Sequence, residues 1–276
     1  MEFGRKFCLK FEMSKKNRIL LCQIYKKTGM KGFVLRILPA FFMLLPLAVA
    51  AQQPETTSRV ATVMPTPRSE WLGSFSGISI NGRMHVRLIK NTTDEGPRIT
   101  YDHKGEISAK FKVAVDRSGV LKIEEPIDPK RTTITEVTVW CNDISSLSVT
   151  AADLTFENTI TRDMFDLEVA GGANVVAKLE VTDLVIGATG RYSTLVVEGT
   201  AKYLSLDIST AKFDGTALST VSAIVDASHL AEVQVSASER LQGTTSTSAK
   251  ILYTGEPSIV RARTTMFGGE ITSVKR

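Results

Sequence analysis

Four ten-residue segments decide the fold of this chain: LSVTAADLTF (147–156), LEVAGGANVV (167–176), LVIGATGRYS (184–193) and LSLDISTAKF (204–213). Three further segments continue the series less regularly: AIVDASHLAE (223–232), LQGTTSTSAK (241–250) and RARTTMFGGE (261–270). Their starting residues are spaced by 20, 17, 20, 19, 18 and 20 residues. Most begin with an apolar–any–apolar triplet and continue with small or turn-forming residues. A fixed period of about 19 residues is typical of a solenoid.

Each repeat is too short to hold both a helix and a strand, and its residues are mostly β-branched or small. Stacked coils of this kind place the strand of one repeat beside the same strand of the next, about 4.8 Å away, with the apolar side chains in inward rows. The repeats over 147–276 therefore predict an all-β chain in the form of a parallel β-helix. The alternatives are a leucine-rich repeat, whose L-x-x-L-x-L-x-x-N signature is absent, and a β-sandwich.

The residues before the repeats predict a less regular β region. Apolar and polar residues alternate over 75–80 and 84–88, on either side of Asn81-Gly82, which predicts two strands joined by a turn. The alternation continues at 107–115, 120–123 and 134–139. A solenoid has two open ends, so we expect residues 71–140 to cover one of them and the last repeat to finish the other.

The N-terminal part predicts export. An uninterrupted apolar run at 37–51 follows Lys31 and Arg36 and is shorter than the about 20 residues that span a membrane. Near its end, Ala48-Val49-Ala50 places small residues at the −3 and −1 positions of a signal-peptidase site. These features predict a secretory signal peptide at 30–51, so that no stable transmembrane span remains after cleavage.

The sequence divides into four parts. Residues 1–29 are basic and lack a core pattern, and we interpret them as an extension upstream of a start at Met30, which gives a signal peptide of ordinary length. Residues 52–70 combine three prolines with polar neighbours and are interpreted as a linker. The folded domain is then expected at 71–276, with its regular repeats at 147–276.

The positive charge of the chain lies in residues 1–51 and not in the folded domain. The whole chain has 34 Lys+Arg and 29 Asp+Glu, whereas residues 52–276 hold 24 basic and 27 acidic residues. The slightly acidic composition of residues 52–276 argues against nucleic acid as a partner.

Only Cys141 follows residues 1–51, which excludes an internal disulfide in the exported protein. Its position beside Trp140 predicts that it is a small buried hydrophobic residue. Export without disulfides indicates a bacterial protein of the periplasm, the outer-membrane surface or the medium.

Three features of the sequence carry a resemblance to a known family. FSGISING (75–82) followed by VRL (86–88), the repeated L-x-V ladder and YTGEP (253–257) resemble the putative auto-transporter adhesin head GIN domain. The resemblance covers about 71–276. It implies a right-handed β-helix in an exported protein of Bacteroidetes-type bacteria, in a family of largely unknown function for which adhesion is inferred. It implies no catalytic residues.

The chain departs from the family at the corners of the repeats. The family commonly carries Ser-Gly-x-Gly-like corners, whereas many corners here carry Ala, Thr or Ser, as in Ser209-Thr210 and Ser228-His229. The fold that the resemblance implies does not depend on this difference, but a function tied to glycine-rich corners would.

No motif for a metal or a nucleotide stands out. His85, His103 and His229 are scattered, and neither a calcium-binding repeat nor an EF-hand loop is present. The glycines lie between β segments and not before a helix, so they are interpreted as corners: Gly171-Gly172, Gly187, Gly190 and Gly268-Gly269. We therefore expect no metal and no cofactor.

Asp207 and Asp226 are the best candidates for catalysis. Both occupy the fourth place of successive repeats, and each precedes a serine by two positions, Ser209 or Ser228. In register they would lie about 4.8 Å apart, close to the about 5–5.5 Å of the carboxylate pair in a retaining glycosidase. The alternative is that Asp and Ser form turns at a corner.

The aromatic residues after the leader do not form one platform for sugar stacking. Tyr192, Tyr203, Tyr253 and Phe213 occupy different positions in the repeat, which favours packing in the core or at its rim.

The sequence thus predicts an exported, non-enzymatic β-helical protein that presents a repetitive face to a glycan, a matrix or an envelope protein. The alternatives are a carbohydrate-active hydrolase or lyase and a purely structural envelope protein.

Overall fold

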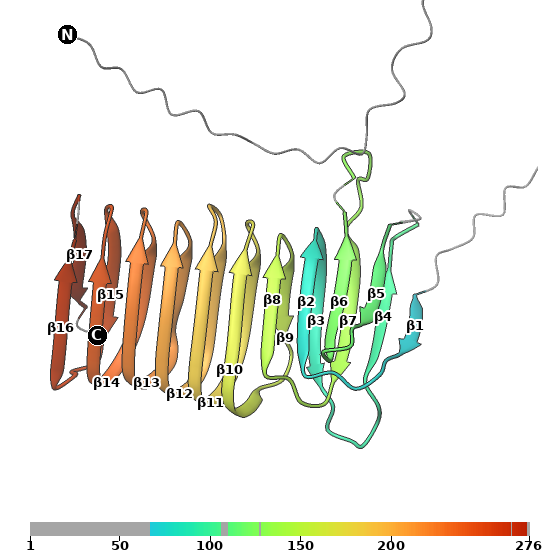
Figure 1. The fold of residues 1–276 in the computed structure, drawn as a ribbon, viewed down its shortest axis with the longest axis horizontal. Coiled ribbons are helices and arrows are strands. Elements are labelled where there is room, and N and C mark those ends of the chain that lie inside the picture. Colours follow the sequence, from blue (N-terminus) through green and yellow to red (C-terminus); the bar gives the residue numbers. More distant parts are fainter. Residues whose placement is uncertain (1–66, 106–109, 127, 266, 275–276) are drawn as a thin grey trace, which may run out of the picture. The chain divides into compact units, whose positions relative to one another are not determined.

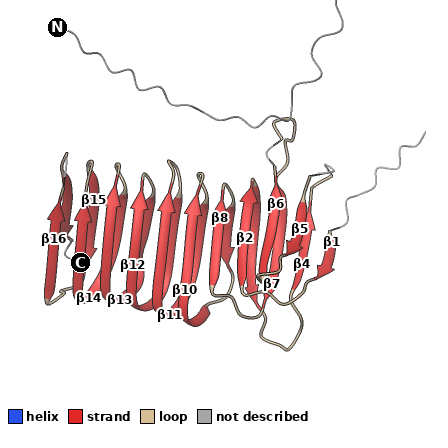
Figure 2. Cartoon of the chain, in the orientation of Figure 1, coloured by secondary structure: helices blue, strands red, loops and turns tan. Residues whose placement is uncertain are grey.

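The chain folds into a β-solenoid of about six turns, shown as a ribbon in Figure 1. The computed structural model describes residues 67–105, 110–126, 128–265 and 267–274, and these contain strands and loops but no helix (Figure 2). The predicted all-β parallel β-helix is confirmed, and its parallel pairing excludes the β-sandwich. The predicted leader, 1–51, lies outside the described residues. Across the ranges described, no helix exists that is long and apolar enough to cross a membrane.

Seventeen strands make up the described chain. In order they are β1 (Arg68–Trp71), β2 (Gly77–Gly82), β3 (Met84–Lys90), β4 (Arg98–Asp102), β5 (Lys112–Val115), β6 (Val120–Glu125), β7 (Thr135–Cys141), β8 (Ser146–Thr150), β9 (Asp153–Phe156), β10 (Ile160–Ala170), β11 (Asn174–Thr189), β12 (Thr194–Ser209), β13 (Lys212–Ser228), β14 (Glu232–Thr245), β15 (Ala249–Thr254), β16 (Ile259–Thr264) and β17 (Gly269–Ser273).

The strands form two parallel ladders, which we name the first and the second sheet. The first sheet runs β6, β2, β8, β10, the C-terminal parts of β11 to β14, and β16. The second runs β7, β3, β9, the N-terminal parts of β11 to β14, β15 and β17. The long strands β11 to β14 contribute to both sheets.

The first coil in the sequence is not the first coil in space. β2 pairs with β6 on one side and β8 on the other, and β3 lies in the same way between β7 and β9. The coil β2–β3 is therefore inserted between two coils that follow it in the chain. Asn81 and Gly82, which were expected to form a turn, are the last two residues of β2, and only Arg83 separates them from β3. The chain bends there into the other sheet and does not close a hairpin.

The N-terminal end of the solenoid is covered by antiparallel strands, as expected for residues 71–140. β4 pairs with the outer edge of β7, β5 pairs with the edge of β6, and β1 pairs with β4. β1 includes Arg68–Glu70, the last residues of the segment interpreted as a linker. At the other end, β16 and β17 form the last coil, and within the described ranges neither has a strand on its outer edge.

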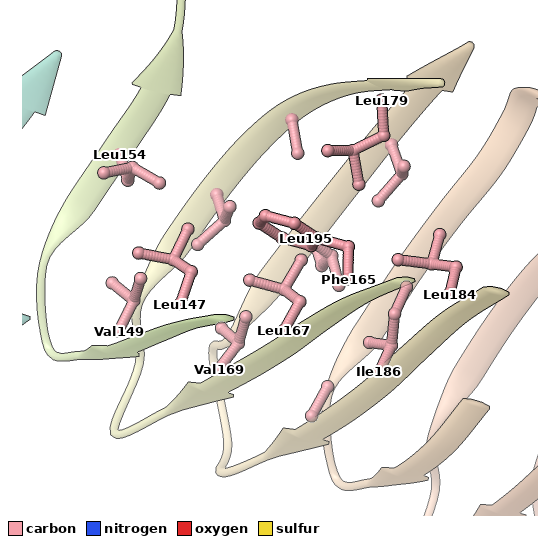
Figure 3. Close-up of a cluster of buried hydrophobic side chains, with 14 of the residues drawn as sticks. Leu147, Val149, Leu154, Phe165, Leu167, Val169, Leu179, Leu184, Ile186 and Leu195 are labelled. Atoms are coloured by element: carbon pink, nitrogen blue, oxygen red, sulfur yellow. The ribbon is translucent and has the colours of Figure 1, made fainter. Parts of the chain in front are cut away.

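The core consists of rows of apolar side chains, one from each coil. Leu147, Leu167 and Ile186 are register partners and are fully buried (Figure 3). The repeat starts predict that Leu184 lies beside Leu167, but Leu184 pairs with Phe165. A shift of two residues keeps the same side chains inside the solenoid, so the alternating pattern alone does not distinguish the two registers. The last repeat differs by one residue, because Val260 and not Arg261 pairs with Leu241.

The tight corners between the two sheets require left-handed backbone. At 170–173, 228–231 and 246–249 the fourth residue donates a backbone hydrogen bond to the first, at 3.1–3.2 Å. Both central residues of each corner have positive φ, as in a type I′ turn. Only the first of the three has glycines at both places, and the corner at 228–231 carries His229 and Leu230. Gly187, expected at a corner, lies within β11.

A row of small residues follows these corners and fills the inside of the bend. The members are Ala152, Ala173, Ser193, Ala211, Ala231 and Ala249, and each is at most 2% exposed. Each is followed by a polar residue and then by an apolar one. This second pattern is visible in the sequence, as a small, a polar and an apolar residue in succession.

Glycine is required where neighbouring coils approach at a bend. A Cβ atom on Gly199, whose φ is +117°, would lie 2.0 Å from the backbone oxygen of Leu179. Gly82 and Gly255 would meet the backbone oxygens of Glu125 and Ala237 at 2.0 and 2.2 Å. These contacts involve backbone atoms that hydrogen-bonded strands hold in place, so they cannot be relieved by moving a side chain.

The substitution Gly199→Ala should destabilise the protein by at least about 2 kcal/mol, because it adds a backbone collision to an unfavourable φ. Gly187→Ala is the matched control on the neighbouring coil, since its Cβ would meet nothing within 4 Å. We expect it to change the free energy of unfolding by no more than about 0.5 kcal/mol. Chemical denaturation of both variants measures the difference; equal stabilities would contradict the backbone contact.

The variant Leu230→Gly should be more stable than Leu230→Ala by about 1 kcal/mol, because glycine removes the Cβ clash of left-handed backbone while alanine keeps it. Leu230 is 68% exposed, so little packing is lost in either variant. Thermal denaturation of the pair gives the comparison. A more stable alanine variant would show that the corner is not strained.

Candidate functional site

The outer face of the first sheet, from β10 to β16, is the first candidate surface, and we call it the first face. Three rows cross it, each with one residue from β10, β11, β12, β13, β14 and β16 in that order. The first row is Met164, Asp183, Tyr203, Ser222, Arg240 and Ile259; the second is Asp166, Val185, Ser205, Ile224, Gln242 and Arg261; the third is Glu168, Gly187, Asp207, Asp226, Thr244 and Arg263. Acidic residues occupy β10 to β13, and arginines occupy β14 and β16.

The two catalytic candidates lie on this first face. Asp207 and Asp226 are register partners on β12 and β13, as the repeat predicted, and both side chains are exposed. Their neighbours in the row are Gly187 and Thr244. The carboxylates therefore stand side by side on an open strand surface, and no cation of the row is adjacent to either.

A serine–histidine contact lies at the nearby corner. The Nδ1 atom of His229 is 3.2 Å from the Ser209 hydroxyl and 3.1 Å from the Ser228 hydroxyl. A nucleophile needs a base that is itself oriented by a third group through its other nitrogen. Here one nitrogen contacts both serines at an exposed corner, so the arrangement is that of a corner hydrogen bond.

The outer face of the second sheet, the second face, has a different charge pattern. One row runs Glu136, His85, Asp153, Asn174, Thr194, Lys212, Glu232, Lys250 and Glu270. Neighbours along it interact directly. Lys212 Nζ is 2.8 Å from Glu232 Oε2, and Asp153 accepts a hydrogen bond from Asn174 at 2.7 Å. The charges of this face are thus largely compensated within the chain.

A shallow hollow of about 290 Å³ lies at the corner where the inserted coil meets the first repeats. Arg83, Gly171 and Gly172 line it, together with His85 and Asp153, whose Nε2 and Oδ2 atoms are 3.1 Å apart. The histidine and the aspartate are each about half exposed, so this pair belongs to the surface. Among the residues that the structure describes, no three His, Cys, Asp or Glu side chains are grouped to hold a metal ion.

Cys141 is a core residue, as predicted. It is fully buried, and its thiol lies 3.7 Å from the backbone oxygen of Ile89. Burial is the main reason why the pKa of the Cys141 thiol is raised to about 12; the charge of Lys90 acts in the opposite direction, and the Asp143 carboxylate acts in the same direction as burial. The thiol is therefore protonated at neutral pH and is not activated as a nucleophile.

The aromatic residues divide between the core and the surface. Phe213 is buried and Tyr253 is partly buried against the core, whereas Tyr192 is 81% and Tyr203 is 46% exposed. Tyr203 lies on the first face, beside Lys202, whose Nζ is 5.2 Å from the centre of its ring. Tyr192 lies at a corner with positive φ. The two exposed rings therefore do not share a surface.

Sequence reasoning missed a buried ionic cluster near the N-terminal end. Glu125 is 3% exposed and forms an ion pair with Arg131, and its Oε1 atom is 3.9 Å from His103 Nδ1. Arg131 also donates to the Thr135 hydroxyl at 3.1 Å. Burial lowers the pKa of His103, although the Glu125 carboxylate acts in the opposite direction. The residues are up to 32 positions apart in the sequence, and no repeat links them, so no sequence pattern could have grouped them.

The fold and its surfaces define a class of protein: a parallel β-solenoid whose outer residues stand in regular rows. The particular family follows from the sequence. The profile of the family "Putative auto-transporter adhesin, head GIN domain" matches residues 74–257, and the chain belongs to this family. No curated protein matches the chain.

Solved structures share the fold at low sequence identity. A putative adhesin from Bacteroides fragilis NCTC 9343 is 18% identical, with a TM-score of 0.69, and the match covers 76% of this chain and 96% of that one. A putative adhesin from Parabacteroides distasonis ATCC 8503 is 15% identical, with a TM-score of 0.61 and coverages of 76% and 96%. A putative lipid binding protein from the same strain is 16% identical, with a TM-score of 0.60 and coverages of 75% and 96%.

In the protein without residues 1–51, which hold Cys8 and Cys22, the Cys141 thiol should not react with a thiol reagent at pH 8. The thiol is buried, and pH 8 is well below its pKa of about 12, so it stays protonated. In denaturant it should react at the rate of an ordinary cysteine. Absorbance assays with an aromatic disulfide reagent compare the two conditions. Rapid modification of the folded protein would contradict the buried position.

Proposed function

We propose that this chain is an exported, non-catalytic binding protein of the bacterial envelope or surface, which presents the outer faces of its solenoid to an extended glycan, a matrix or an envelope protein. The observation that carries the proposal is the pair of open faces, in which each coil adds one exposed side chain to every row. A regular, extended surface suits an extended partner. Membership in a family described as adhesin-like supports the same role.

The shape of the surface favours binding over catalysis. An enzyme site is usually concave, with charged groups that converge on one point and exclude water. The only charged groups in the corner hollow are surface side chains, and the Asp207 and Asp226 carboxylates stand on an open strand surface outside it.

A glycan-hydrolysing function is the second candidate, since Asp207 and Asp226 are in register at about the spacing of a retaining carboxylate pair. Under our proposal the double variant Asp207→Asn/Asp226→Asn keeps the binding of any ligand that does not contact these residues, and it has no hydrolytic activity to lose. Release of reducing ends from envelope polysaccharides by the unchanged protein, abolished in the double variant with stability preserved, would favour the enzyme instead.

Accessibility to protease on intact cells of the native host is the decisive test. We expect the domain to be cleaved on intact cells, or to be found in the medium, because a surface binder must reach partners outside the cell. A periplasmic protein serves as the protected control. If the domain is protected until the outer membrane is opened, the surface role fails, and a role within the envelope takes its place.

A further inference from the structure

The charges of the first face are not compensated within the chain. Acidic neighbours adjoin each other, as at Asp207 and Asp226, and the arginines gather at the other end. Within the described ranges, none of the eight charged residues on the three rows forms an ion pair. The Nε atom of Arg240 is buried and lacks a hydrogen-bond partner there. On the second face, by contrast, Lys212 meets Glu232 and His85 meets Asp153.

The same face exposes large apolar side chains. Met164, Val185, Tyr203, Ile224 and Ile259 are 41–55% exposed, and all of them belong to the first two rows. Scattered exposed apolar residues are normal, but a group of this size on one flat surface, surrounded by charges, is typical of a protein–protein contact.

Each row is complementary to itself when its order is reversed. A two-fold axis parallel to the strands, placed between β12 and β13, would bring the face of a second copy over the first with the coils in opposite order. In the first row, Asp183 then faces Arg240 of the second copy, and Met164 faces Ile259 of the second copy. In the other two rows, Asp166 faces Arg261 and Glu168 faces Arg263 of the second copy.

We propose that the first face binds a second copy of this chain to form a symmetric dimer. One axis position brings one acidic residue of each row opposite the arginine of the same row, although the three rows differ in composition. Such self-complementarity is what an isologous interface requires. The charge pairs that the chain lacks within itself are then formed between copies, which fixes the register of the contact.

The axis also creates one unfavourable contact. Asp207 of one copy faces Asp226 of the other, so that four carboxylates meet near the axis in the third row. Like charges at such a point weaken the dimer. Removal of these carboxylate charges should therefore strengthen the dimer, an effect that an unspecific contact would not show.

The size of the face indicates a weak dimer. Six strands about 4.8 Å apart and three rows of residues give a patch of about 500 Å² per copy. A standard stable interface buries about 800 Å² per partner. We therefore expect reversible, concentration-dependent association. In this dimer the binding role proposed above rests on the second face, which remains open.

Sedimentation equilibrium over a range of concentrations tests the proposal, with the protein purified as its native host processes it. The expected result is a monomer–dimer equilibrium. Arg261→Glu/Arg263→Glu should raise the dissociation constant at least tenfold, and adding Asp166→Arg/Glu168→Arg to the same chain should restore it. Asp207→Asn/Asp226→Asn should lower the dissociation constant several-fold.

The control is Lys212→Glu/Lys250→Glu, an equal charge reversal on the second face, which should leave the equilibrium unchanged. A monomer at every concentration would overturn the proposal and leave the first face for a different partner. A dimer that the control weakens as much as the arginine variant, or that the Asp207/Asp226 variant fails to strengthen, would also overturn it. Circular dichroism of each variant shows whether the fold is retained.

Discussion

The structure depends on one constraint: parallel strands are stacked in register, so that each residue meets its counterpart in the next coil at about 4.8 Å. Side chains at equivalent positions of successive repeats therefore form a row along the solenoid axis. An apolar residue becomes a buried row, as with Leu147, Leu167 and Ile186, and a small residue becomes the row that fills the bend. A charged residue is set against whatever the next repeat carries at that place. Core, corner and surface are consequences of the same stacking.

The stacking also explains which residues the chain cannot replace. At Gly82 and Gly255, a Cβ atom would collide with a backbone oxygen of the adjacent coil, and at Gly77 it would lie 2.6 Å from the Ser146 hydroxyl. All three glycines belong to the motifs that carry the family resemblance, and Ile78 and Ile80 of the same motif are buried. The recognisable residues of the family thus encode the path of the backbone. They identify the fold without describing a ligand, so function has to be sought in side chains that the motif leaves free.

The β-helical architecture could be predicted from the sequence because the period of about 19 residues recurs in seven segments, so that a few irregular repeats do not hide it. The sequence predicted the register of Asp207 with Asp226 correctly, since both repeats are regular there. It failed by two residues between Leu167 and Leu184, because such a shift leaves the pattern of inside and outside unchanged. It could not predict the inserted coil β2–β3, whose neighbours both come later in the chain. The ionic cluster around Glu125 could not be predicted either, because its residues are close in the structure but do not occupy equivalent positions of a sequence repeat.

The two faces share one backbone geometry but differ in their charge patterns. They have the same strand spacing and are built from the same long strands β11 to β14. On the second face, opposite charges alternate along the row, and ion pairs such as that of Lys212 with Glu232 lie within it. On the first face the charges are separated into an acidic part on β10 to β13 and a basic part on β14 and β16, and exposed apolar side chains lie within both parts. Unpaired like charges at one strand spacing repel each other, so this separation is a cost to the isolated chain. A surface that is less favourable alone and complementary to its own reverse is explained most simply by a contact between copies, and the fold contributes to that contact only by keeping the rows straight.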